Sequence, residues 1–144
     1  MGPTEENKAI VKRLYGELNR GNLNVADELI VPDYAQHSIL PVPPGREGFK
    51  QFFAAFGAAF PDAHFAIEDL FGEGDRVAMR FRGQFTHKGP FMGIPPSGKR
   101  ITMTGIDVFR LKGGKIVEHW DQVDQLGFLQ QLGAIPPTGE PRKQ

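Results

Sequence analysis

The chain has 144 residues, enough for one domain, 1–144, that encloses a pocket as well as a core. Seventeen basic residues balance seventeen acidic ones, so neither nucleic acid nor an acidic membrane surface is expected as the main partner. The lack of cysteine excludes a disulfide framework, a thiolate metal site and a cysteine nucleophile. No apolar stretch has the character of a signal peptide or the length of a membrane span, and we expect a cytoplasmic protein.

Helical periodicity dominates the first part of the chain. Thr4 is expected to cap a first helix that ends at Gly21, and a second, short helix is expected over 24–30. Prolines predict a loop over 33–44. A third helix then carries a phenylalanine stripe that is mainly core and can also form a pocket wall: Phe49, Phe52, Phe53, Phe56 and Phe60.

Strand periodicity follows. Alternating apolar residues predict strands over 64–71 and 77–86, and glycines and prolines predict a long loop over 88–99. A hairpin comes next, then a helical turn over 125–132 and a proline-rich tail over about 136–144. Helices followed by a run of antiparallel strands indicate an α+β domain, with the helices packed on one face of a curved sheet.

The last hairpin places ionisable residues among apolar neighbours. A three-residue loop, Lys112-Gly113-Gly114, would pair Asp107 with His119 and Gly105 with Asp121, so that these side chains share one face. The alternative is a two-residue turn of the two glycines alone, which shifts the register by one and separates Asp107 from His119. We favour the three-residue loop.

In that register two carboxylates and an imidazole point into an apolar interior, where burial and neighbouring charges shift pKa values. One interpretation is a buried ion pair between Asp107 and His119 that only fixes the packing. We favour a pocket, because three titratable groups lie beside Gly105, which is expected to leave open space.

Four stretches of the chain carry a specific pattern. They are Gly45-Arg46-Glu47-Gly48, the loop Thr86 to Lys99 with Gly93-Ile94-Pro95-Pro96-Ser97-Gly98, the hairpin Asp107 to Asp121 with Glu118-His119-Trp120-Asp121, and Asp124-Gln125-Leu126-Gly127. Together they resemble the SnoaL-like polyketide cyclase family over nearly the whole chain. The resemblance implies a cone-shaped α+β barrel of the nuclear-transport-factor-2-like superfamily. The resemblance further implies helices packed on the concave side of a curved antiparallel sheet around a pocket, and assembly into a homodimer or homotetramer.

The resemblance also implies a chemistry, the intramolecular aldol condensation that closes a ring in a polyketide methyl ester, with no metal or cofactor. An acid at the position of Asp121 is the general base in this family, and His119 matches a second pocket residue. The chain departs from the family at Asp107, where the antibiotic-pathway cyclases carry histidine, and at Gly105, where they carry a longer polar side chain.

The residues fit that chemistry. A carboxylate shielded from water, such as Asp121, can remove a proton next to a carbonyl. His119 would donate to the enolate oxygen or shuttle the proton, and Asp107 would keep it charged. The substrate is expected to be a small hydrophobic molecule with a carbonyl group, bound by Asp107 and four other residues: His37, Tyr15, Phe52 and Phe56.

The remaining candidates have simpler alternatives. His37 is assigned equally to the pocket and to an exposed loop, whereas surface positions are expected for His87 and His64. Tyr15 could instead only satisfy a hydrogen bond in the core. Trp120 faces away from Asp121, and we expect the outward face that it shares with Ile106 and Val108 to be covered by another copy of the chain. The histidine spacings do not predict a metal site.

Two other functions are retained as hypotheses. An epoxide-hydrolase-like enzyme could use Asp107 and Asp121 to activate a water molecule. A non-catalytic small-molecule-binding or dimerisation module would need neither acid. A mainly apolar pocket that contains Asp121 favours an enzyme, and a collapsed one favours the module.

Overall fold

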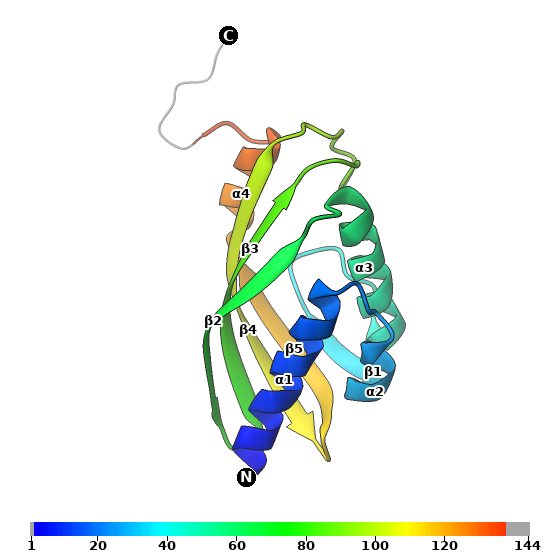
Figure 1. The fold of residues 1–144 in the computed structure, drawn as a ribbon, viewed down its shortest axis with the longest axis vertical. Coiled ribbons are helices and arrows are strands. Elements are labelled where there is room, and N and C mark those ends of the chain that lie inside the picture. Colours follow the sequence, from blue (N-terminus) through cyan, green and yellow to red (C-terminus); the bar gives the residue numbers. More distant parts are fainter. Residues whose placement is uncertain (1, 138–144) are drawn as a thin grey trace.

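A five-stranded curved sheet in the order β1-β5-β4-β3-β2 organises the molecule, and α1 and α3 lie on one side of it (Figure 1). The computed structural model describes residues 2–137, so most of the predicted proline-rich tail lies outside the described residues. The strands are β1 Ile30–His37, β2 His64–Glu73, β3 Arg76–Thr86, β4 Arg100–Lys112 and β5 Lys115–Val123. The helices are α1 Pro3–Asn19, α2 Val25–Leu29, α3 Gly45–Ala59 and α4 Gln125–Leu132. The α+β class is confirmed.

The start of α1 differs from the prediction. Thr4 lies inside the helix, and the N-cap is Gly2, which makes no side-chain capping hydrogen bond. The helix begins early because Pro3 already has the backbone angle of a first helical turn and has no N–H to satisfy. The Thr4 hydroxyl instead donates to the carbonyl oxygen of Gly74, at 3.4 Å.

The predicted loop over 33–44 is wrong in its first half. Residues as far as His37 belong to β1, which pairs in parallel with β5 and makes the sheet mixed rather than purely antiparallel. Pro32 is tolerated in this strand because β1 is at the edge of the sheet, where no second neighbour needs its missing N–H. The pairing places Gln36 beside His119.

The turn between β4 and β5 is the two-residue alternative, so the favoured three-residue loop is wrong. Gly113 and Gly114 both have positive φ angles, 58° and 79°, as a tight hairpin turn requires. The pairing then shifts at Val117, an extra residue in β5, and beyond it Asp107 lies opposite Asp121. This bulge restores odd-to-odd pairing. The inward orientation of Asp107, His119 and Asp121 therefore agrees with the prediction, although the partners differ.

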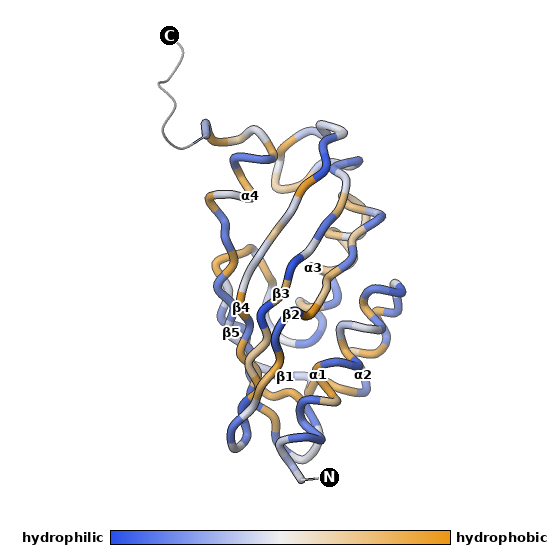
Figure 2. Tube along the Cα trace, turned by 60° about the vertical axis from the view of Figure 1, so that its left-hand side comes forward, coloured by the Kyte–Doolittle hydropathy of each residue, from blue (hydrophilic) through white to orange (hydrophobic). Residues whose placement is uncertain are grey.

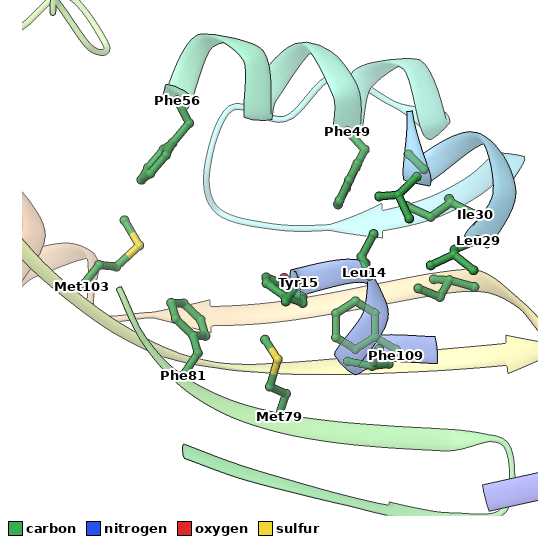
Figure 3. Packing of buried hydrophobic residues seen from close by; sticks show 14 of the residues in the cluster. Leu14, Tyr15, Leu29, Ile30, Phe49, Phe56, Met79, Phe81, Met103 and Phe109 are labelled. Carbon is green, nitrogen blue, oxygen red and sulfur yellow. The ribbon is translucent and has the colours of Figure 1, made fainter. Parts of the chain in front are cut away.

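The core lies between the inner face of the sheet and the helices. Along β3 buried and exposed residues alternate, and Figure 2 shows the same alternation of hydropathy along the strands. Figure 3 shows Phe49 and Phe56 reaching from α3 toward Phe81 on the sheet, with Tyr15 of α1 between the two layers. Within residues 2–137, none of the helices combines the length and hydropathy needed to cross a bilayer.

Candidate active site

The pocket lies between α3, α1 and the inner face of the sheet and encloses about 50 Å³. Six phenylalanines form most of its wall: Phe49, Phe52, Phe53, Phe56, Phe65 and Phe81. Its polar lining comes from five residues: Tyr15, Gln36, Asp107, His119 and Asp121. The structure therefore brings together all the predicted site residues except His37, and it adds Gln36.

Asp107 and His119 form a buried hydrogen-bonded pair. The Nε2 atom of His119 lies 2.8 Å from Oδ1 of Asp107, and its Nδ1 atom lies 2.9 Å from Oε1 of Gln36. The ring stacks on Phe109, with 4.5 Å between centroids and 10° between planes. Both ring nitrogens therefore face acceptor oxygens, an arrangement that a protonated imidazole satisfies completely.

Asp121 is held by Gln36 of the neighbouring strand β1 and by Ser38, which directly follows that strand. Its Oδ1 accepts a hydrogen bond of 2.9 Å from the Ser38 hydroxyl, and its Oδ2 accepts a long one of 3.5 Å from Nε2 of Gln36. Gln36 thus donates to Asp121 and accepts from His119 with the two ends of one amide. Its carbonyl oxygen also accepts a hydrogen bond from the Tyr34 hydroxyl.

Burial raises the pKa of the Asp121 carboxyl above its usual range, and the nearby charge of Asp107 adds to the rise. The hydrogen bond from Ser38 and the positive charge of His119 oppose it. Asp121 remains 8% exposed, whereas Asp107 is 3% exposed. A partly desolvated carboxylate that a small molecule can still approach is suited to accept a proton.

Tyr15 supplies a hydroxyl to the same pocket. It makes no hydrogen bond to any residue between 2 and 137, so its O–H can serve a ligand. Burial, reinforced by the charges of Asp107 and Asp121, holds the pKa of Tyr15 well above its usual value. The hydroxyl therefore stays protonated at neutral pH and remains a donor.

The structure decides between the two positions predicted for His37 and corrects the one predicted for His87. The structure does not bring His37 to the pocket: its ring stacks on Trp120 at 5.3 Å, and its Nε2 lies 2.8 Å from the Glu118 carboxylate. His87 is fully buried rather than at the surface, because Nδ1 contacts Ser97 and the ring packs on Phe60. His64 is exposed, as predicted.

Gly105 leaves no open space beside Asp121, which corrects a second expectation. It lies opposite Val123, and a Cβ at this position would lie 2.8 Å from the ring of Phe81. The glycine therefore allows Phe81 to pack against β4, and the pocket forms elsewhere.

Gln36, Ser38 and Tyr34 were missed by the sequence analysis, because they fall in the segment predicted as a loop. The available signal was the apolar pair Ile30-Val31, followed by the buried aromatic Tyr34, which is typical of a strand.

Asp107, His119 and Asp121 could together bind a cation, since their ligand atoms lie within 4.8 Å of one another. A metal ion bound by His119 would have to replace one of the two hydrogen bonds of its ring, to Asp107 or to Gln36. The carboxylate and imidazole donors are compatible with several divalent ions and select none.

The chain is similar to known proteins over most of its length. The family model of the SnoaL-like polyketide cyclases matches residues 9–132. Aklanonic acid methyl ester cyclase DauD of Streptomyces sp. strain C5 is 30% identical over 135 residues, 91% of this chain and 84% of the relative.

Two solved structures share the fold. IdmH of Streptomyces antibioticus, proposed to be a polyketide cyclase, is 36% identical, with a TM-score of 0.76 over 88% of this chain and 98% of its own. AclR of Streptomyces galilaeus, proposed to be a hydroxylase, is 29% identical, with a TM-score of 0.85 over 95% of this chain and 87% of its own.

Proposed function

Since this chain belongs to the SnoaL-like polyketide cyclase family, we propose that it closes a ring by cofactor-free intramolecular aldol condensation in a small hydrophobic carbonyl compound. The observation that carries the proposal is Asp121, a carboxylate with a raised pKa in a pocket walled mainly by phenylalanine. The relatives that cyclise polyketide methyl esters support the same class of substrate.

The proposed reaction begins when Asp121 removes a proton from a carbon next to a carbonyl. The resulting enolate carbon attacks a ketone carbonyl of the same molecule, so that one carbon–carbon bond forms and the ketone oxygen becomes an alkoxide. The proton held by Asp121 returns to that alkoxide. Nothing leaves the molecule, and the product is an isomer of the substrate.

The Tyr15 hydroxyl is the proposed donor to the enolate oxygen, the role of an oxyanion hole. We had expected His119 to donate, but both of its ring nitrogens are already hydrogen-bonded. The proposed role of His119, held by Asp107, is to fix the Gln36 amide that orients Asp121. Phe52 and Phe56 would hold a flat substrate against the base.

The proposal also covers assembly and partners. A homodimer or homotetramer is supported by apolar side chains on the outer sheet face, where Ile106 is 51% exposed and Phe71 is 61% exposed. A cytoplasmic location is proposed with it. No nucleic acid, membrane, cofactor or metal is required by the proposed chemistry.

The test is incubation of the purified protein with aklanonic acid methyl ester, the compound in the name of DauD. We expect a product of unchanged mass and different chromatographic retention, formed equally fast with and without EDTA. A product heavier by one oxygen atom would indicate hydroxylation instead. An ester that binds but stays unchanged would favour the binding module, and loss of turnover with EDTA would show a metal-dependent reaction.

A further inference from the structure

A second hollow adjoins the candidate active site. It encloses about 230 Å³ where the end of α1 meets α3, and we call it the distal groove. Nine of its lining residues do not line the catalytic pocket, among them Leu18, Leu23, Ala54, Gly57, Pro61 and Ala63. Three others, Phe53, Phe56 and Phe65, line both spaces, so the groove and the pocket are neighbours that share these residues.

The size of the pocket makes this neighbour important. Ligand sites usually measure about 300–1,000 Å³, whereas the catalytic pocket encloses about 50 Å³. A flat ring system with a substituent needs more room than that. Phe53 and Phe65 are only half-buried, so these two rings can move aside at a lower packing cost than the buried Phe56.

The lining of the groove defines the chemistry of its occupant. No charged side chain lines it, and its one polar side chain, Asn19, is already used. The Asn19 amide donates to the carbonyl oxygen of Phe65 at 2.9 Å and accepts from the Phe65 N–H at 2.8 Å. The other lining side chains are small or apolar, so a charged or strongly polar group would lose its hydration there without gaining a partner.

We propose that the distal groove is a subsite for an apolar substituent of the substrate, an alkyl or aryl group attached to the ring system that reacts at Asp121. The substituent enters by displacing the Phe53 ring, which joins the two spaces into one site. This assignment rests on the proposed function, because the substrate's ring system is taken to react at Asp121. The groove makes the site selective for ligands that carry such a substituent.

Gly57 allows a clean test. A Cβ at this position would meet no atom within 4 Å, so Gly57→Leu places a side chain in the groove from a residue that does not line the catalytic pocket, and leucine suits a helix better than glycine. Gly16→Leu is the matched control, because Gly16 is also helical with open space around its Cα and lines neither hollow. The probes are the methyl and hexyl esters of anthraquinone-2-carboxylic acid, whose binding is measured by isothermal titration calorimetry.

We expect wild-type protein and Gly16→Leu to bind the hexyl ester about tenfold or more tightly than the methyl ester, a ratio in the range that hydrophobic subsites give. Gly57→Leu should bind the methyl ester unchanged and lose the preference for the hexyl ester. Equal binding of both esters by wild type, no binding of either, or a preference that survives Gly57→Leu would overturn the subsite. Turnover of aklanonic acid methyl ester decides the proposed function independently of these affinities.

Discussion

Replacing Asp121 with asparagine separates the role of Asp121 as proton acceptor from its contribution to folding. The asparagine can keep both hydrogen bonds of the carboxylate. Its carbonyl oxygen would accept from Nε2 of Gln36, and its amide would donate to the Ser38 hydroxyl, which can accept as well as donate. Hydrogen bonds to a neutral group are weaker by about 1 kcal/mol, but a neutral side chain is also easier to bury than a carboxylate.

These two effects oppose each other, so Asp121→Asn should change the free energy of unfolding by no more than about 1 kcal/mol, or about 2–4 °C in Tm for a chain of this size. Turnover should fall by about 10²–10⁴, the usual contribution of a positioned acid-base group, which corresponds to about 3–5 kcal/mol in activation free energy. The assays are thermal unfolding by circular dichroism and initial rates with aklanonic acid methyl ester.

The raised pKa of Asp121 fixes the sign of the pH dependence. The folded protein binds the proton more tightly than the unfolded chain, so this contribution to stability is complete below the unfolded pKa, about 3.9, and is lost as pH rises through the folded pKa. The Tm of wild type minus that of Asp121→Asn should therefore decrease with rising pH. The acidic limb of kcat/KM should lie above pH 3.9. A variant that keeps more than a tenth of the turnover, or a Tm difference that increases with pH, would refute the reasoning.

Three further variants test the rest of the site and the outer face. Tyr15→Phe breaks no hydrogen bond within residues 2–137, so stability should change by less than about 1 kcal/mol while turnover falls by about 10²–10³. Unchanged turnover would exclude Tyr15 as the donor. Gln36→Leu should slow turnover roughly 10²-fold and move the acidic limb of kcat/KM to higher pH, because Asp121 loses a donor; an unmoved limb would show that Gln36 does not act through Asp121. Ile106→Lys should convert a dimer into monomers in sedimentation velocity, and a wild-type protein that is already monomeric at micromolar concentration would exclude the predicted interface.

Side-chain alternation predicted the inner face of the hairpin because it depends only on neighbours in the sequence. Asp107, His119 and Asp121 share that face with Phe109 and Met103. The prediction was wrong for contacts made across the sheet. Gly105 was expected to leave space, but the ring of Phe81 on the neighbouring strand fills it. No pattern in the sequence of β4 predicts the position of that ring.

The sequence analysis also missed strand β1, which had the larger effect on the predicted site. Its partner β5 lies more than eighty residues away in the chain, and prolines in and after the segment favoured a loop. An edge strand needs hydrogen bonds on one side only, so composition is a weaker guide there than in a central strand. Gln36 and Ser38, which hold Asp121, could therefore not be predicted before the topology was known.

The hairpin also shows that the inward faces, rather than the length of the turn, set the register. A slip by one residue would turn either Phe109 and Leu111 of β4 or Ile116 of β5 out of the core, where each is at most 3% exposed. Inserting one glycine between Gly113 and Gly114 should therefore lengthen the loop and leave the pairing of Asp107 with Asp121 unchanged. The longer loop costs roughly 0.6 kcal/mol or less, and turnover of aklanonic acid methyl ester should stay within about threefold of wild type. If the folded insertion variant instead lost turnover as severely as Asp121→Asn, turn length would set the register and this argument would be wrong.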